Sequence, residues 1–291
     1  MIICIVGPTA VGKTKLSVEL AKIYNGEIIN ADSTQVYKGM DIGTAKVTKE
    51  EKEGVPHHMF DIKDVTEDYS VFDYQKDARE KISEIKNKGK IPIIVGGSGY
   101  YIKALLYDYE FSNEEVKKDY SHLSNEEIYE KIMDYDVCVP IEKNNRKRNV
   151  RLLEKLENGS FSIQDFKALY DDVLFIGLTT DRDNLYERIN KRFDSMLIDL
   201  IDEVKPFYLK GIKTKAIMNG IGYKELYPFF DHEKTLKECV NDIKKNTRNY
   251  AKRQYTWFMN QMNVTWFTTN YDDFKETILE IVTFIDINKK I

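Results

Sequence analysis

A glycine-rich octapeptide near the start of the chain constrains its fold more than any other feature, because it matches the phosphate-binding pattern GxxxxGK[ST]. The octapeptide is Gly7-Pro8-Thr9-Ala10-Val11-Gly12-Lys13-Thr14. An apolar, β-branched run precedes it, and apolar residues at helical spacing follow it. In such a strand, loop and helix unit, backbone amides and the lysine surround phosphate oxygens. We therefore predict that all eight residues hold a diphosphate or triphosphate, with Mg²⁺ on the Thr14 hydroxyl.

The rest of the first half predicts an α/β fold with a P-loop NTPase-like parallel sheet flanked by helices. Apolar strands at residues 2–6, 27–30, 91–95 and 173–178 alternate with helical segments, which implies right-handed crossovers between parallel strands. Ligands of such sheets bind beyond the carboxyl ends of the strands. The octapeptide, Asp32 and the glycines after residue 95 should all open onto that edge.

Residues 111–170 differ from the segments around them, because they are rich in charge, helix-like and without a convincing strand. We predict a helical insertion over 111–170, within a core formed by residues 1–110 and 171–291. Beyond Asp181 we expect only helices, including one at 182–197 and a long basic one at 240–259.

Charge and cysteine content exclude several classes of protein. The net charge of −4 argues against a surface that binds polyanions throughout, although local basic patches remain compatible with it. The three cysteines are scattered and show no CxxC spacing, so neither a disulfide framework nor a zinc site is indicated. No apolar run reaches the roughly 18 residues of a membrane helix. We expect a cytoplasmic, monomeric protein without a membrane contact.

Two polar positions lie at the ligand edge of the predicted sheet. Asp32 follows the second strand, where a carboxylate can bind Mg²⁺ or accept a proton from a nucleophile; the alternative is a helix N-cap. Ser98 lies in a glycine-rich strand end, which is otherwise typical of a flexible turn. The pair His57-His58 after Pro56 is interpreted as a turn, since sequence neighbours do not form a metal site.

Basic residues are concentrated in two clusters, one in the insertion and one near the C-terminus. No acidic residue occurs between Ile243 and Met262, and aromatic residues are interleaved there. This pattern favours contact with a phosphate backbone and stacked bases, although a solvated helix face is the alternative. Arg188 and Arg192 share one face of a helix and are predicted to clamp a phosphate group, with a surface ion pair to Glu187 as the alternative.

Several longer motifs resemble the tRNA dimethylallyltransferase (tRNA isopentenyltransferase) family, in its bacterial form. Besides the octapeptide, these motifs occupy residues 30–37, 40–46, 56–58, 95–99, 220–225 and 247–254, and they are collinear with the family over nearly the whole chain. The resemblance implies transfer of a dimethylallyl group from its diphosphate to N6 of the adenosine 3′ of the anticodon, in tRNAs that read codons beginning with U. The octapeptide would then hold an isoprenoid diphosphate. Its motif is also typical of ATP binding, but that indication comes from the motif alone.

The resemblance also assigns roles to individual residues. Asp32 is the expected general base, and Ser98 and Arg192 complete the catalytic group. Arg188 is added from its spacing to Arg192 and not from the resemblance, and it is expected to join the octapeptide in binding diphosphate. The expected partners are dimethylallyl diphosphate and the anticodon stem-loop of tRNA, and the expected cofactor is Mg²⁺. Contacts to tRNA are expected from Asp32, Ser33, Thr34, Gln35, Ser98, Lys117, Lys147, Arg148, Arg151, Tyr223, Arg248, Lys252 and Arg253.

The sequence departs from the family pattern at two positions. Ser98 stands where threonine is usual, which keeps the hydroxyl but loses the methyl that restricts its rotamer. Asn145 stands where aspartate is common, which removes any ionic role there. The main alternative function is a P-loop kinase of a nucleoside or small metabolite. An adenylate isopentenyltransferase is a further alternative, which the basic clusters disfavour. A non-catalytic tRNA-binding module is another, and it predicts that Asp32→Asn leaves all function intact.

Overall fold

The computed structural model describes residues 1–111, 118–135, 141–159, 161 and 166–289 of the chain. It divides into a core unit of Met1–Tyr107 with Ala168–Ile291 and a smaller unit of Asp108–Lys167. The sequence division was expected at residues 110 and 170. Among the described residues, no helix combines the length and the apolar character that crossing a membrane requires.

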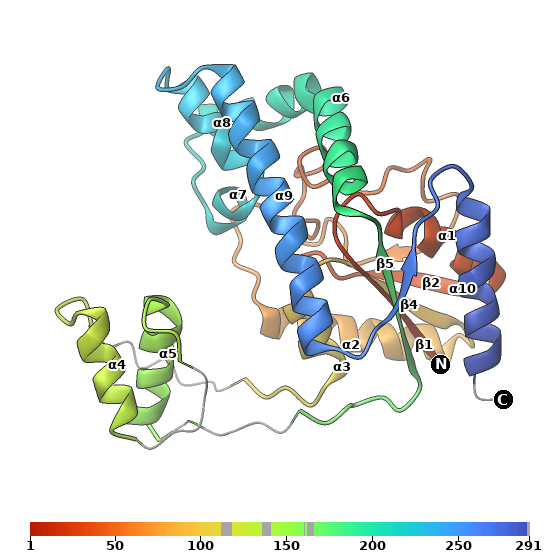
Figure 1. The fold of residues 1–291 in the computed structure, drawn as a ribbon, viewed down its shortest axis with the longest axis horizontal. Helices are drawn as coiled ribbons and strands as arrows, with labels where there is room; N and C mark the ends of the chain where they lie inside the picture. The colour runs from red at the N-terminus through yellow and green to blue at the C-terminus, as the bar shows by residue number, and fades with distance from the viewer. Residues whose placement is uncertain (112–117, 136–140, 160, 162–165, 290–291) are drawn as a thin grey trace. The chain divides into compact units, whose positions relative to one another are not determined.

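The core unit contains a parallel sheet, as the alternating strands predict. Its strands are β1 (Ile2–Val6), β2 (Gly26–Asn30), β3 (His57–His58), β4 (Ile91–Val95), β5 (Val173–Thr179) and β6 (Thr265–Thr268). They lie in the order β3-β2-β4-β1-β5-β6, and every neighbouring pair is parallel. The α/β fold predicted from the sequence is confirmed (Figure 1).

Two predictions about the edges of the sheet were wrong. The histidine pair forms the edge strand β3 and not a turn, because His57 and His58 pair with Ile28 and Ile29 of β2. The C-terminal region is not entirely helical, because β6 pairs with β5. Both strands are short and lie at an edge, where half of the backbone groups need no sheet partner. The sequence pattern that would predict β3 and β6 is therefore weak.

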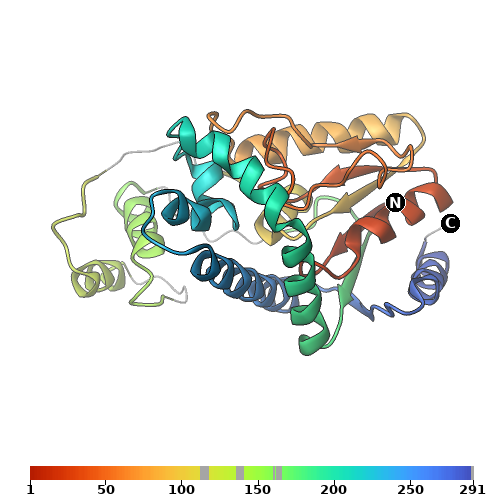
Figure 2. The same cartoon turned by 90° about the horizontal axis from the view of Figure 1, so that it is seen from above.

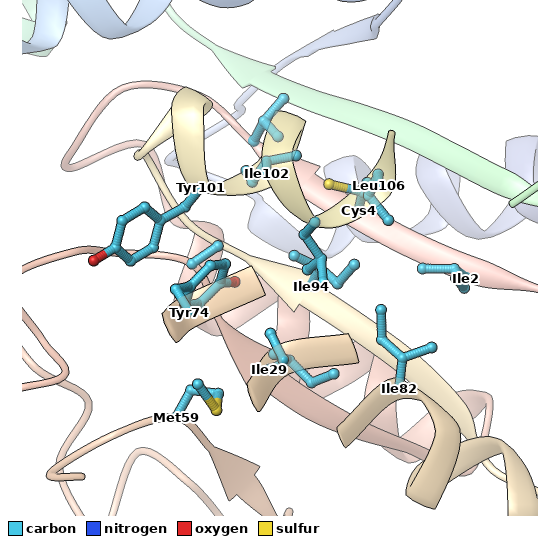
Figure 3. Packing of buried hydrophobic residues seen from close by; sticks show 14 of the residues in the cluster. Ile2, Cys4, Ile29, Met59, Tyr74, Ile82, Ile94, Tyr101, Ile102 and Leu106 are labelled. Atoms are coloured by element: carbon cyan, nitrogen blue, oxygen red, sulfur yellow. The ribbon is translucent and has the colours of Figure 1, made fainter. Parts of the chain in front are cut away.

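Helices cover both faces of the sheet. On one face, α1 (Lys13–Ile23) and α10 (Phe274–Asn288) pack against alternate residues such as Ile3 and Ile5. On the other face, α2 (Val71–Asn87) and α3 (Gly99–Leu106) enclose Cys4, Ile29 and Ile94. Figure 3 shows this second layer, in which Tyr74 and Tyr101 stack at 4.1 Å between ring centroids. Successive side chains of a strand point to opposite faces of the sheet, and helices cover both faces. These strands therefore consist of unbroken apolar runs.

A second group of helices continues from the ligand edge of the sheet. It consists of α6 (Arg182–Leu209), α7 (Lys215–Asn219), α8 (Tyr223–Phe230) and α9 (Leu236–Gln261). These helices share their own apolar core, which also includes Val36 and Met40 from the segment after β2. The far end of α9 returns to the sheet, where Phe258 is fully buried. Helix α9 therefore spans from the helical core to the sheet (Figure 2).

The smaller unit contains α4 (Asn125–Met133) and α5 (Arg146–Glu157). Helix α4 begins with a capping box between Ser124 and Glu127. The two helices bury Ile128, Ile132 and Leu153 between them. Within its described residues the unit is helical, as the sequence predicts.

Candidate active site

A cavity of about 850 Å³ lies over the carboxyl ends of β1, β2 and β4. Its walls come from the octapeptide, the segment after β2, the glycines after β4, and helices α6 and α9. All of these belong to the core unit. The cavity lies where ligands of parallel α/β sheets bind, as predicted.

The octapeptide forms an open helix N-terminus. Helix α1 begins at Lys13 after Gly12, and no side chain caps it. The Lys13 ammonium donates hydrogen bonds to the carbonyl oxygens of Gly7 at 2.9 Å and Pro8 at 2.6 Å. First-turn amides that no side chain caps, together with this ammonium, make an anion-binding site.

Two cationic side chains and one carboxylate meet in the cavity: Lys13, Arg192 and Asp32. Burial lowers the pKa of Lys13 to about 8, the Asp32 carboxylate acts to raise it, and the Arg192 guanidinium lowers it further. The pKa of Arg192 is also lowered, by burial first of all. The structure thus brings together the predicted lysine, acid and arginine from three separate segments of the chain.

Asp32 is oriented by its neighbours in sequence. Its Oδ1 accepts hydrogen bonds from the Thr34 amide at 3.0 Å and the Thr34 hydroxyl at 2.7 Å. The buried Asn30 side chain binds the backbone of Asp32 on both sides, accepting from its amide and donating to its carbonyl. No helix begins there, so the N-cap alternative is wrong. Oδ2 has no hydrogen-bond partner among the described residues, which leaves it free to accept a proton.

Ser98 and the residues after Asp32 are held against one another. The Ser98 Oγ accepts a hydrogen bond from the Ser33 amide at 3.0 Å and lies 3.3 Å from the Ser33 hydroxyl. The Gln35 amide nitrogen donates to the Thr44 carbonyl at 2.9 Å. Ser33, Thr34 and Gln35 line the cavity, so the predicted stretch faces the site as a group.

Gln254 is a site residue that the sequence analysis placed only within a motif. It is buried, its Oε1 accepts from the Thr9 amide at 3.0 Å, and its Nε2 donates to the Gly97 carbonyl at 3.1 Å. Any side chain at Gly97 would collide with it, since a Cβ would lie 1.9 Å from Nε2. The signal that points to it is an uncharged amide on the inner face of a basic helix, between Ala251 and Phe258.

The two arginines of α6 have different surroundings. Arg192 is half-buried and lines the cavity. Arg188 also lines it, and its Nε donates to the Ala10 carbonyl at 3.2 Å. Glu187 pairs instead with Lys191, so the surface ion-pair alternative does not hold for these arginines.

The basic cluster of α9 has an inner and an outer part. Lys244 pairs with Asp194 at 2.5 Å, and the Arg248 Nη1 donates to Asn190 at 2.9 Å. Both bonds join α9 to α6. Lys252 and Arg253 are exposed, and neither has an ion-pair partner among the described residues. Lys252 and Arg253 therefore present charge that no described carboxylate neutralises.

The cluster of the smaller unit lies on α5. Lys147, Arg148 and Arg151 are exposed, and none forms an ion pair with a described residue. Asn145 is the N-cap of α5 and its side chain accepts from the Arg148 amide, which is a structural use for a residue where an acid was expected. Lys117 lies outside the described residues.

Tyr223 requires a correction. Its side chain is fully buried in the helical core, and its hydroxyl donates to Glu203. The same carboxylate accepts from the backbone amides of Asp41, Ile42 and Gly43. Tyr223 therefore supports the segment that holds Gln35 and does not offer a surface to RNA.

Comparison with known proteins places the chain in a family. Residues 35–261 match the model of the IPP transferase family. The chain belongs to this family. The tRNA dimethylallyltransferase of Anoxybacillus flavithermus is 46% identical over 98% of this chain and 96% of its own length. That of Bacillus subtilis is 48% identical over 91% of this chain and 90% of its own.

Solved structures agree with this assignment. The full-length tRNA isopentenylpyrophosphate transferase of Bacillus halodurans is 43% identical, with a TM-score of 0.78 over 99% of this chain and 96% of that one. A eukaryotic dimethylallyltransferase acting on tRNA is 28% identical, with a TM-score of 0.83 over 100% of this chain and 80% of that one.

Proposed function

We propose that this protein transfers a dimethylallyl group from dimethylallyl diphosphate to N6 of the adenosine 3′ of the anticodon in tRNA, releasing diphosphate. The observation that carries the proposal is one cavity whose lining includes the anion-binding loop, the Asp32 carboxylate and the arginines Arg188 and Arg192 of α6. Family membership and the names of the relatives support tRNA as the acceptor.

The octapeptide holds the leaving diphosphate. As the bond between C1 and its oxygen breaks, the electron pair passes to the diphosphate, and negative charge grows on its oxygens. Lys13, Arg192 and the loop amides stabilise this charge, because oriented donors in a partly buried site need little reorganisation. Thr14 lines the cavity beside Lys13, and its hydroxyl would hold Mg²⁺, which would neutralise diphosphate charge.

Asp32 prepares the nucleophile. The N6 amine of adenine is weakly nucleophilic because its lone pair is delocalised into the ring. As N6 forms its bond to C1, its proton passes to the free Oδ2 of Asp32. Gln35 lines the same cavity and would orient the base, and Ser98 would support this wall by accepting from the amide of Ser33, which also lines it. The base must leave the anticodon-loop stack, and contacts elsewhere offset that cost of a few kcal/mol.

The exposed basic residues supply those contacts. Arg253 lines the cavity, and Lys252 is exposed next to it on α9. Lys147, Arg148 and Arg151 are exposed on α5 of the smaller unit. Single-sign faces with interleaved aromatic residues suit an RNA backbone. The monomeric state and the cytoplasmic location remain predictions.

One assay tests the proposal. The purified protein is incubated with unmodified tRNA, Mg²⁺ and dimethylallyl diphosphate, without ATP, and the nucleosides of the digested anticodon stem-loop are analysed by mass. We expect one adenosine per tRNA to gain the mass of a dimethylallyl group in place of hydrogen. Consumption of ATP with tRNA left unmodified would favour the kinase alternative.

A further inference from the structure

The tip of the octapeptide contains a residue in an unfavourable conformation. Ala10 has a φ of 68°, in the left-handed region that residues with a Cβ rarely adopt. Such a conformation persists only where the surroundings fix it, and it is frequent at functional sites. The side chains that contact the tip therefore show what holds the loop in shape.

Two side chains bind the carbonyl oxygen of Ala10. Arg188 donates from Nε at 3.2 Å, and the Tyr271 hydroxyl makes a longer hydrogen bond at 3.5 Å. The Arg188 guanidinium also lies 3.7 Å from the centroid of the Tyr271 ring, a cation–π contact. Tyr271 therefore limits the orientations from which Arg188 can donate.

The next two residues of the loop contact the same C-terminal segment. The Thr269 hydroxyl is buried and donates to the Val11 carbonyl at 3.0 Å. Gly12 has a φ of 97°, and a Cβ there would lie 2.8 Å from the Phe274 ring. Three consecutive loop residues are thus each contacted by a side chain from residues 269–274.

These residues, which we call the brace, connect β6 to α10. The edge strand β6 pairs with β5, and β5 pairs with β1, the strand that leads into the octapeptide. This order places the brace beside the loop, and in Figure 1 the brace is the blue segment that leads into α10. The brace lies beyond residue 261, where the match to the family model ends.

We propose that the brace is a positioning element that holds the octapeptide in its diphosphate-binding conformation, with Tyr271 and Thr269 as positioning residues. The proposal rests on the proposed function, since it takes diphosphate as the ligand of the loop. Neither Tyr271 nor Thr269 lines the cavity; both act on carbonyl groups of the loop. Their loss should weaken diphosphate binding and leave the RNA surface intact.

Two substitutions with matched controls test the brace. Tyr271→Leu removes the stacking surface, and Thr269→Val removes a hydroxyl while keeping the shape. The controls are Thr268→Val, an exposed neighbour on β6, and Tyr24→Leu. Tyr24 also joins α1 to α10, through a hydrogen bond to Asp286 at 3.0 Å, but at the end of α1 remote from the loop.

The affinity of the full chain for inorganic diphosphate is measured by calorimetry with Mg²⁺, beside tRNA affinity, kcat and the melting temperature. We expect the diphosphate Kd to rise about tenfold in Tyr271→Leu and about threefold in Thr269→Val, from the lost cation–π contact and hydrogen bonds. The tRNA affinity of the brace variants should stay within about twofold of the wild-type value. The diphosphate affinity of the two control variants should also stay within about twofold of wild type.

The outcomes separate the two proposals. Wild-type diphosphate affinity in both brace variants would overturn the brace and leave the proposed function standing. An equal loss of affinity in the controls would also overturn it, because the effect would then be general destabilisation. If Tyr271→Leu does not fold, Thr269→Val decides. A wild-type chain that fails to bind diphosphate would overturn both proposals.

Discussion

Helices α9 and α5 look alike in sequence, since each carries several basic residues, but their inner faces differ. The inner face of α9 reaches the strand ends, where Gln254 joins the octapeptide to Gly97. The inner face of α5 also carries a buried amide, Asn149, whose hydrogen bonds to described residues go to the carbonyls of Glu142 and Lys143 in its own unit. A basic cluster can therefore belong to a catalytic site or only to a binding surface, and the buried polar residue distinguishes the two.

The largest effect should come from the acid beside α9. Burial and the nearby Asp32 raise the pKa of Tyr250 of α9, so this helix borders the proposed base directly. Asp32→Asn should lower the single-turnover rate by a factor on the order of 10² or more, because a general base is lost. Affinity for tRNA should be largely kept. An unchanged rate in rapid-quench experiments would remove Asp32 from the mechanism.

The two buried amides provide the sharpest test of the comparison. Gln254→Leu leaves the Thr9 amide and the Gly97 carbonyl without their partner, which costs about 1–3 kcal/mol for a buried group. We expect at least a tenfold rise in KM for dimethylallyl diphosphate. Asn149→Leu should leave that KM unchanged. Equal effects of the two variants on KM would contradict the distinction between the helices.

The pH dependence tests the charge of the octapeptide. Burial lowers the pKa of Lys13 to about 8 in the free protein, so Lys13 is charged below that pH and neutral above it. The value of kcat/KM for dimethylallyl diphosphate should therefore fall as pH rises through about 8, by up to tenfold per unit. In Lys13→Arg this fall in kcat/KM above about pH 8 should disappear, since arginine stays protonated. If the fall in kcat/KM persists in the arginine variant, a group other than Lys13 causes it.

The smallest effects should come from the exposed charges. Replacing Lys252 and Arg253 by alanine should weaken tRNA binding several-fold, and so should replacing Lys147, Arg148 and Arg151. In each case the slope of log K against log salt concentration should become shallower by about 0.7 per lost phosphate contact. The rate at saturating tRNA should change little. Lys244→Ala is the control, because Lys244 is paired with Asp194. A salt dependence that does not change would show that these faces do not bind RNA.

The sequence predicts the parts of the site that depend on local patterns. Motif and spacing predict that the octapeptide, Asp32 and the two arginines of α6 face the ligand, and Asp32, both arginines and part of the octapeptide line one cavity. Fold class and most strand bounds followed from apolar runs, because strands buried on both faces leave an unbroken signal.

Long-range contacts account for what the sequence analysis missed. Tyr223 belongs to a recognisable motif, but only the packed structure shows that its hydroxyl is used by Glu203. Arg248 and Lys252 lie in one basic run, and only the position of α6 distinguishes the bonded residue from the exposed one. The brace was missed for the same reason, since residues 269 and 11 are distant in the chain.

The central claim is that the octapeptide binds a diphosphate that leaves from carbon. Dimethylallyl diphosphate labelled with oxygen-18 at the oxygen between C1 and phosphorus tests it most directly, with tRNA as the acceptor and no ATP. We expect all of the label to be released in diphosphate, in equal amount to prenylated adenosine. Label recovered in dimethylallyl alcohol, with phosphate passed to another acceptor, would contradict it.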